Sequence, residues 1–537
     1  MDDRFPLVAL ERVSFRFADG ATLFEALSEV FDNRHTGLVG RNGVGKSILG
    51  RLLAGELQPS DGRVLRQGRI AYLPQRIVAA PGARVVDLMG CAPWFDALQR
   101  VMGGEPHADD IETLDGRWDV IERLQRALQD EGLGHLDPQT PAMQLSGGEC
   151  SRVALLGALL AEADLLILDE PGNHLDLPSR RRLGQRLASW RGGLVLISHD
   201  RELLAGMQRI VELSAAGLRS YGGGYAFYQA SRQREREAAR QTLDSARVER
   251  KRGERELRQQ QERQQQRSAS GLRQGKDSNQ AKILLGMQKN RSESSAGRTA
   301  KRLDSRRQQL DEQVREAVAA LVEEPPVTLH GQTESLPPGR RVLYWRDLRL
   351  PFGAASLPDF ELFGSRRVAV LGPNGCGKSS LLAVLSGRLA PLSGECRVEV
   401  PWALLDQHLH GLDAQESALE HLQRLAPGSA ESLLRTRLVH LGVDAEAALL
   451  PSARLSGGQR LKVALAGVLA RDPTPQLLLL DEPDNHIDLD SRLAVEALLR
   501  DYRGALLVVS HDAAFVDALM PSERLLWTAD GWRHERC

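Results

Sequence analysis

Two glycine-rich segments of the sequence have the residue types and spacing that bind phosphate groups. The first is GRNGVGKS at residues 40–47, and the second, GPNGCGKS at 372–379, follows 332 residues later. Glycines at this spacing let backbone N–H groups approach phosphate oxygens at the start of a helix. We expect Lys46 and Lys378 to hold the β- and γ-phosphates of a nucleotide, with the hydroxyls of Ser47 and Ser379 on Mg²⁺. Because a lone loop of this kind also occurs as a structural turn, the motifs that follow decide its interpretation.

Two apolar stretches that end in an acidic pair carry further chemistry. LLILDE ends at Glu170 and LLLLDE ends at Glu482. Buried parallel strands place such carboxylates at the edge of the sheet that also holds the phosphate loop. We therefore expect Asp169 and Asp481 to bind Mg²⁺, and Glu170 and Glu482 to activate the water that attacks the γ-phosphorus.

The remaining motifs complete an internal repeat. SHD, which follows another apolar strand in each copy, places His199 and His511 where a neutral imidazole can bond a γ-phosphate oxygen. Each copy also has an earlier glutamine and an LSGG segment: Gln75 with Ser146, Gly147 and Gly148, and Gln407 with Ser456, Gly457 and Gly458. The offset is 332 residues at the glutamines, 310 at LSGG and 312 at the histidines, so the first copy is longer between residues 76 and 145. The duplication predicts an α/β protein with two P-loop NTPase domains, at 1–228 and 326–537.

The segment between the copies, 229–325, has a different composition. From 231 to 320 it contains 23 Lys and Arg against 13 Asp and Glu. Residues 233–266 lack Pro and are rich in helix formers, which predicts a long helix, and 299–322 predict a second. Ser- and Gly-containing breaks between them predict a helical hairpin with a basic, partly irregular tip at 268–298. The charge suits a nucleic-acid backbone, and the alternative is a solvated tether whose charges keep long helices soluble.

Over the whole chain the charges balance, with 70 Lys and Arg against 71 Asp and Glu in 537 residues. This balance neither requires nor excludes an anionic partner. The opening MDDRFPLV is unlike a signal or transit peptide, and no apolar stretch reaches the roughly 20 residues that cross a bilayer. Five scattered cysteines without metal-ligand spacing indicate reduced thiols. We expect a cytoplasmic protein.

The ordered motifs resemble those of the ATP-binding cassette (ABC) ATPases over both copies. The resemblance implies two ABC-type cassettes joined by a long α-helical hairpin linker, with ATP and Mg²⁺ as ligands. It also implies that each ATP lies between the phosphate loop of one cassette and LSGG of the other, pairing Lys46 with 456–458 and Lys378 with 146–148. Phe17 and Phe352 fall near the place where the family stacks an aromatic ring on adenine, and a core position is the alternative for both.

The expected ATP contacts therefore include both loops, the glutamines, the LSGG residues and the two phenylalanines. The loop residues are Gly40, Arg41, Asn42, Gly43, Val44, Gly45, Lys46 and Ser47 in the first cassette, and Gly372, Pro373, Asn374, Gly375, Cys376, Gly377, Lys378 and Ser379 in the second. Gln75 and Gln407 are also expected to ligate Mg²⁺.

EPGNHLD at 170–176 and EPDNHID at 482–488 are similar to the EPTNHLD stretch of the ABC-F proteins. Gly172 and Asp484 depart from the usual Thr or Ser, and Ile487 departs from Leu, beside the catalytic carboxylates. ABC-F proteins are ribosome-associated translation factors whose linker contacts the P-site tRNA. The resemblance implies the ribosome, through rRNA and tRNA, as partner, and a monomer that pairs its own cassettes. The residues then expected to contact RNA are Arg273, Lys276, Lys282, Lys289 and Arg291.

Three functions of different classes stay open. They are a ribosome-bound translation ATPase, the ATPase half of a transporter, and an ATPase that acts on another nucleic-acid complex, as in DNA repair. A transporter ATPase needs a membrane partner and no basic hairpin between fused cassettes, and repair ATPases interrupt each cassette with a far longer coiled coil. Within the translation class, regulation, rescue of stalled ribosomes and antibiotic target protection depend on the reach of the linker tip and are not distinguished.

Overall fold

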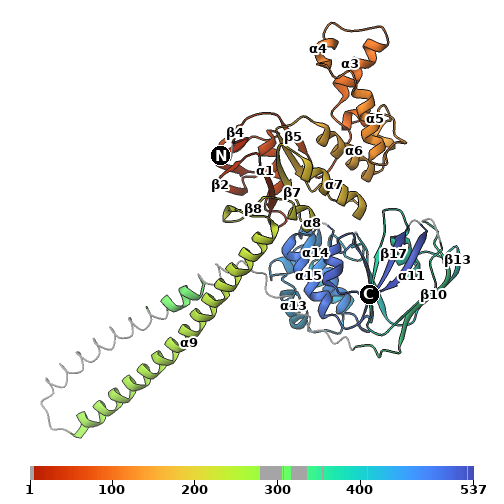
Figure 1. The fold of residues 1–537 in the computed structure, drawn as a ribbon. Coiled ribbons are helices and arrows are strands. Elements are labelled where there is room, and N and C mark those ends of the chain that lie inside the picture. Colours follow the sequence, from red (N-terminus) through yellow and green to blue (C-terminus); the bar gives the residue numbers. More distant parts are fainter. Residues whose placement is uncertain are drawn as a thin grey trace. The chain divides into compact units, whose positions relative to one another are not determined.

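The computed structural model describes residues 5–173, 175–277, 305, 308–315, 335–352, 356–407, 409–485, 487–528 and 530–537. These residues form two compact units, Met1–Phe227 with Pro325–Cys537, and Tyr228–Glu324. The first unit contains both cassettes, and the second contains most of the linker (Figure 1).

Each cassette is built on a six-stranded sheet. In the first the order is β5-β6-β7-β3-β8-β9, and all neighbours are parallel except β8 and β9. The strands are β3 (His35–Val39), β5 (Ile70–Leu73), β6 (Leu165–Asp169), β7 (Gly193–Ile197), β8 (Arg209–Ser214) and β9 (Gly217–Tyr221). Every residue of β6 and β7 is buried, as their continuous apolar sequences predict for a sheet covered on both faces.

The second cassette repeats this sheet in the order β14-β15-β16-β12-β17-β18. Its strands are β12 (Arg367–Leu371), β14 (Trp402–Leu405), β15 (Leu477–Asp481), β16 (Ala505–Val509), β17 (Glu523–Thr528) and β18 (Gly531–Arg536). Asp169 pairs with Ile197 and Asp481 pairs with Val509 in register, so the ends of neighbouring parallel strands meet at one edge. The fold class predicted from the motifs is confirmed.

A small antiparallel sheet packs against each phosphate-loop helix. The orders are β2-β1-β4 and β11-β10-β13. The strands are β1 (Val8–Arg16), β2 (Thr22–Phe31) and β4 (Asp61–Arg66), then β10 (Arg341–Arg349), β11 (Phe360–Phe363) and β13 (Ser393–Val398). In the first cassette Val8 and Phe24 share a core with Leu49 of α1 (Lys46–Ala54) and Ile167 of β6, so the loop is held between two packed sheets.

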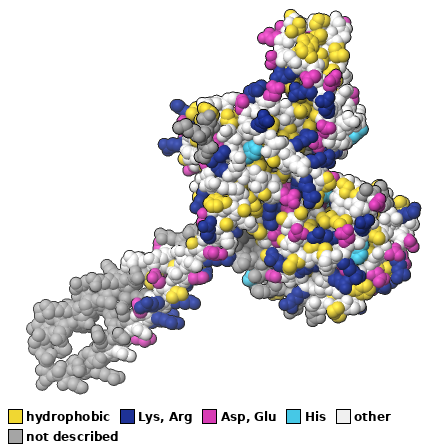
Figure 2. All heavy atoms as spheres, viewed as in Figure 1, with side chains coloured by type: hydrophobic (Ala, Val, Ile, Leu, Met, Phe, Trp, Pro, Cys, Tyr) yellow, Lys and Arg dark blue, Asp and Glu magenta, His cyan; other side chains and the backbone are white. Residues whose placement is uncertain are grey.

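The two cassettes differ most in the helices that precede LSGG. The first has α2 (Val85–Leu88), α3 (Ala92–Met102), α4 (Asp110–Leu114) and α5 (Val120–Asp130), and the second has α12 (Ala418–Leu425) and α13 (Glu431–His440). The extra residues thus form a helical element with its own core, which includes Phe95, Leu114 and Leu124. Hydrophobic side chains gather on the surface over α3 and α4, where Met102 and Ile111 are exposed (Figure 2).

The remaining helices follow the motifs. They are α6 (Gly147–Leu160), α7 (Leu177–Ser189) and α8 (Arg201–Ala205) in the first cassette, and α11 (Lys378–Leu385), α14 (Gly457–Leu469), α15 (Leu489–Asp501) and α16 (Ala513–Ala518) in the second. Short 3-10 turns occur at Ala142–Gln144, Ala447–Leu449 and Ser452–Arg454. No described helix is long and apolar enough to cross a membrane.

The linker contains one long helix, α9 (Tyr225–Asp277). The helix break expected from residue 268 is wrong for 268–277, because a glycine inside a helix costs only about 1 kcal/mol relative to Ala and strong helix formers surround Gly271 and Gly275. Of the second predicted helix, the described residues 308–315 are helical. Arg273 and Lys276 lie on α9, and the other predicted RNA contacts, Lys282, Lys289 and Arg291, lie outside the described residues.

Candidate active sites

Both phosphate loops end in a glycine that starts a helix. Gly45 and Gly377 have φ angles of 104° and 105°, a left-handed conformation that favours glycine, and cap α1 and α11. The lysines that follow fold back over their loops. Lys46 Nζ donates to the carbonyls of Gly40 and Arg41 at 2.7 and 3.0 Å.

The second loop repeats this geometry. Lys378 Nζ donates to the carbonyls of Gly372 and Pro373 at 2.9 and 2.8 Å. Burial lowers the pKa of both ammonium groups, although nearby carboxylates partly offset this effect. The two loops thus present equivalent cations and backbone donors to an anion.

The aspartates at the ends of β6 and β15 keep one oxygen available. Among the described residues, Oδ1 of Asp169 and Oδ1 of Asp481 are buried without a hydrogen-bond partner. Burial raises the pKa of Asp169 and raises that of Asp481 to about 6, although Ser47 and Ser379 donate to these carboxylates. Mg²⁺ binds oxygen ligands, and it is usually held by one or two carboxylates together with phosphate oxygens. A carboxylate with a free buried oxygen next to a serine hydroxyl therefore fits this ion.

The glutamates that come next have an unusual backbone. Glu170 and Glu482 have φ angles of 50° and 49°, in the left-handed region that non-glycine residues rarely adopt. Their N–H groups donate to the carbonyls of Ile197 and Val509, both at 2.8 Å, which fixes each strained residue to the neighbouring strand. Strain retained at the same place in both cassettes indicates a functional constraint on the direction of the carboxylate.

Each glutamate faces its histidine, with different electrostatics in the two cassettes. His199 Nε2 lies 3.5 Å from Glu170 Oε1, and His511 Nε2 lies 3.2 Å from Glu482 Oε1. Burial raises the pKa of Glu170 to about 7. Burial alone would also raise the pKa of Glu482, but the adjacent His511 side chain lowers it below the usual value. Burial and the charge of Lys46 lower the pKa of His199 well below its usual value, which keeps this imidazole neutral.

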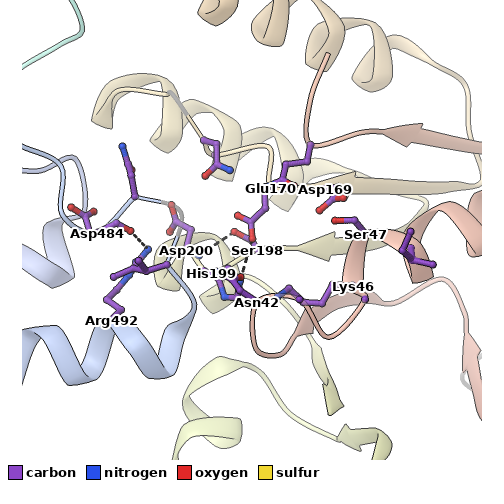
Figure 3. A pocket seen from close by; sticks show the side chains of 18 of the residues that line it. Asn42, Lys46, Ser47, Asp169, Glu170, Ser198, His199, Asp200, Asp484 and Arg492 are labelled. Carbon is purple, nitrogen blue, oxygen red and sulfur yellow. Dashed lines mark hydrogen bonds and ion pairs between the residues drawn. The ribbon is translucent and has the colours of Figure 1, made fainter. Parts of the chain in front are cut away.

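A cavity of about 370 Å³ opens at the first phosphate loop, and both cassettes line it. Figure 3 shows Lys46, Glu170 and His199 from the first cassette facing Asp484 and Arg492 of the second. A direct hydrogen bond joins the loops at this point, because Asn42 N donates to Asp488 Oδ2 at 3.0 Å.

The second cavity has the same volume, about 370 Å³, and includes Lys378, Glu482 and His511. Leu175 and Arg180 of the first cassette complete it. Gln75 lines the first cavity and Gln407 the second, as expected for residues that follow the phosphate loops.

The two phenylalanines lie at the mouths of these cavities. Phe17 lines the first and is 44% exposed, and Phe352 lines the second and is 66% exposed. The alternative that they are core residues is therefore wrong. Their exposed rings are available to stack on a planar base.

The LSGG segments start helices but do not line these two cavities. Ser146 accepts from Glu149 N to cap α6, and Ser456 accepts from Gln459 N to cap α14. Among the described lining residues, Gly457 lies in a neighbouring cavity that Gln75 and Asn173 of the first cassette also line, together with Gln407 and Glu482 of its own. The structure thus does not bring Lys46 together with 456–458, or Lys378 with 146–148.

Sequence reasoning missed a cluster of buried charges at the contact between the cassettes. Arg180 Nε lies 3.1 Å from Asp200 Oδ2, and Arg180 Nη1 donates to the His511 carbonyl of the other cassette at 3.2 Å. Arg492, the equivalent residue 312 positions later, pairs with Asp512. The sequence does contain a sign of this cluster, because Arg180 and Asp200 recur as Arg492 and Asp512 at the offset of the histidines.

Comparison with known proteins gives concordant matches. The ABC transporter family model matches residues 27–173 and 358–485. The chain is 32% identical to the probable ATP-binding protein YheS of Escherichia coli strain K12, over 94% of this chain and 76% of that protein. It is 30% identical to the tylosin resistance ATP-binding protein TlrC of Streptomyces fradiae, over 94% of each. A solved structure of the archaeal ribosome recycling factor aABCE1 with ribosomal stalk protein aP1 matches with a TM-score of 0.60 and 19% identity, over 97% of this chain and 89% of that one, which concerns the fold alone.

Proposed function

The chain belongs to the ABC ATPases, within the ABC-F group, and we propose that its two cassettes close on two ATP molecules to act on the ribosome in the cytoplasm. The ATPase activity follows from the family. The ribosome, its P-site tRNA and a monomeric working state are the proposed part. The observation that carries the proposal is that each phosphate-loop cavity is lined by both cassettes, so a nucleotide in either one contacts the interface between them.

The residues divide the chemistry of hydrolysis in the same way at both sites. The loop N–H groups with Lys46 or Lys378 bind the β- and γ-phosphates, and Phe17 or Phe352 stacks on adenine. Glu170 or Glu482 accepts a proton from the attacking water, and His199 or His511 orients the γ-phosphate. Asp169 with Ser47 and Gln75, or Asp481 with Ser379 and Gln407, would hold Mg²⁺, which neutralises charge on the phosphate oxygens when bound.

Closure completes each site with LSGG from the opposite cassette. The starts of α6 and α14 present backbone N–H groups, which together with the helix dipole favour the γ-phosphate. ATP then holds the cassettes together, and hydrolysis releases them because the γ-phosphate no longer joins the two cassettes. The linker is attached to both cassettes, so it would take one position when they are closed on ATP and another after hydrolysis.

The linker supports a nucleic-acid partner. Its 23 basic residues against 13 acidic ones between 231 and 320 favour a phosphate backbone without sequence readout. The exposed apolar surface over α3 and α4 offers a second contact with the same partner. TlrC, which matches over 94% of both chains, is named for tylosin resistance, and YheS is not, so both translation regulation and drug-target protection fall within the proposal.

The test is co-sedimentation of the Glu170→Gln, Glu482→Gln variant with ribosomes through a sucrose cushion, with and without ATP. This variant binds ATP without hydrolysing it, so we expect it to pellet with ribosomes only when ATP is present. The matched control adds Lys46→Ala and Lys378→Ala, which removes ATP binding and should abolish pelleting. Absence of pelleting at low salt would overturn the ribosome as partner and leave the ATPase intact.

The RNA contacts are tested separately by salt dependence. Replacing the five predicted linker contacts by Glu should weaken ribosome binding and flatten its dependence on salt, because each lost phosphate contact lowers the slope. Unchanged binding would overturn the assignment of Arg273, Lys276, Lys282, Lys289 and Arg291. A drug-susceptibility assay with tylosin in a sensitive host separates target protection from a general role in translation.

A further inference from the structure

One buried ion pair crosses between the cassettes beside the first active site. Arg201 Nη2, on the first residue of α8, lies 2.8 Å from Glu496 Oε1 on α15 of the second cassette. The side chains are 15% and 3% exposed. Burial raises the pKa of Glu496, and the Arg201 guanidinium opposes that rise. The Arg201 guanidinium thus helps to keep the buried Glu496 carboxylate charged.

Arg201 is joined to the catalytic histidine by a short, well-fixed loop. His199 lies two residues before it, and Asp200 caps α8 by accepting from Glu202 N and Leu203 N at 2.9 and 3.2 Å. Asp200 also pairs with Arg180. The histidine loop, residues 198–201, and α8 are therefore held as one body, and a shift of Arg201 shifts His199.

The other end of α8 lies against the start of the linker helix. A Cβ added to Gly224 would lie 2.8 Å from the Met207 carbonyl and 3.9 Å from the Ala205 carbonyl. Tyr225, the first residue of α9, is buried, and the charges of Arg201 and Glu496 act on its hydroxyl. The unit formed by residues 198–201 and α8 thus carries His199 at one end and lies against the base of α9 at the other.

The second active site has no counterpart of this ion pair. At the offset of 312 residues, Ala513 occupies the position of Arg201 and Gly184 that of Glu496. The histidine of the second site is held across the interface by Arg180, which donates to the neutral carbonyl of His511. The two histidine loops are therefore anchored by different interactions.

We propose that Arg201 is a positioning residue chiefly for the first ATP site, holding the His199 loop against Glu496 of the second cassette and against the base of α9. ATP is bound mainly by the phosphate loop, so loss of the ion pair affects turnover and not ATP binding. The proposal goes beyond the ribosome-directed function and needs no ribosome. It rests on the proposed catalytic roles of Glu170 and Glu482, whose double variant tests those roles by itself.

The experiment measures ATP turnover in two full-length backgrounds. Glu482→Gln leaves only the first site active, and Glu170→Gln leaves only the second. In the Glu482→Gln background we expect Arg201→Ala to lower kcat on the order of ten-fold, with KM for ATP changed less than about two-fold. In the Glu170→Gln background the same substitution should lower kcat much less, because Arg201 reaches the second site only indirectly, through Asp200 and Arg180.

Three further variants separate positioning from general support of the fold. Glu496→Gln keeps the size of the side chain and should reproduce the loss at the first site, and Arg201→Lys keeps the charge and should recover most of kcat. Arg524→Ala is the matched control, because Arg524 Nη2 pairs with Asp517 Oδ1 of α16 at 2.9 Å within the second cassette. This substitution should leave kcat unchanged in both backgrounds.

The outcomes are distinct. Equal loss of kcat in both backgrounds, or a folded Glu496→Gln variant with full first-site turnover, would overturn the proposal. Failure of Arg201→Lys to recover turnover would overturn it as well. Undiminished turnover in the Glu170→Gln, Glu482→Gln double variant would instead reject the catalytic roles on which the test depends.

Discussion

Arg492 in the second cassette lies between two carboxylates, whereas the equivalent Arg180 in the first has one. Arg492 pairs with Asp512, donates to the Asp484 carbonyl at 3.2 Å and is attracted by the Asp484 carboxylate. Arg180 pairs with Asp200 alone and extends across the interface to His511. Arg492 makes its hydrogen bonds within its own cassette, although the Asp200 carboxylate of the first cassette also attracts it. Arg180 donates a hydrogen bond across the interface.

The sequence difference behind this contrast is small. Gly172 in the first cassette stands where the second has Asp484, at the position where ABC-F proteins usually carry Thr or Ser. The catalytic carboxylates and histidines are the same in both copies, and the phosphate loops differ only in Arg41 against Pro373 and Val44 against Cys376. Duplicated active sites can thus be made unequal by residues beside the catalytic groups, without any change in the catalytic groups themselves.

The largest expected effect concerns the catalytic glutamates. The double variant Glu170→Gln, Glu482→Gln should lose about 10²–10⁴-fold in ATP turnover, because both general bases are removed. Each single variant should keep part of the activity, and the two single variants should differ, because the contacts around the two sites differ. Phosphate release at saturating ATP measures this. Equal residual rates in the two single variants would contradict the inequality of the sites.

The second prediction compares the two arginines. Arg492→Ala leaves two buried carboxylates without their cation and should cost about 3–5 kcal/mol of unfolding free energy. Arg180→Ala leaves one, Asp200, and should cost about 1–3 kcal/mol. Urea unfolding of both variants under identical conditions measures the ranking. A larger loss for Arg180→Ala would show that the contact with His511 outweighs the buried carboxylates.

Sequence patterns were sufficient for the parts of the molecule that depend on local spacing. Phosphate loops, strand-end carboxylates and histidines each lie within a few residues of a buried strand, so their placement at one sheet edge follows from the strand order. Phe17 and Phe352 could not be decided, since an aromatic residue suits a core and a ligand equally. Only their exposure at the cavities separates these alternatives.

Contacts between the cassettes could not be predicted, because they join residues 295 to 446 positions apart. Neither Arg201 nor Glu496 belongs to a motif, and nothing in the sequence indicates that they meet. The end of α9 was also misplaced, since the cost of a single glycine is small against the propensity of the residues around it. Arg180 and Arg492 recur at the same offset as the catalytic histidines, and this repeat could have indicated that both arginines lie near the ATP sites.

The third prediction uses the ionisation of Asp484. Burial raises its pKa to about 6, with Asp512 adding to the rise, and Arg492 and Ser510 opposing it. Between pH 3.8 and about 6 the folded protein binds more protons than the unfolded chain, so stability falls as pH rises through this window. Asp484→Asn should remove that loss and gain up to about 3 kcal/mol at pH 7.5, and less at pH 5. Unfolding of both proteins at the two pH values measures it, and a pH-independent difference would contradict the assignment.

The smallest expected effect tests the origin of the contrast directly. In Gly172→Asp the added Cβ would lie 3.3 Å from Leu203 Cδ1 and 3.6 Å from Asp200 Oδ2, positions that a flexible side chain can relieve. The new carboxylate should pair with Arg180 and weaken its hydrogen bond to the His511 carbonyl, worth about 1 kcal/mol. With Glu170→Gln present to isolate the second site, turnover should then fall a few-fold.

Gly172→Ala is the matched control for this substitution, because it adds the same Cβ without the charge. It should leave second-site turnover unchanged, whereas Gly172→Asp lowers it. If both variants lower turnover equally, the space at Gly172 and not the charge would determine the position of Arg180. If only Gly172→Asp lowers it, a single carboxylate beside each arginine decides whether that arginine crosses the interface, and the two cassettes differ in function because they differ at this position.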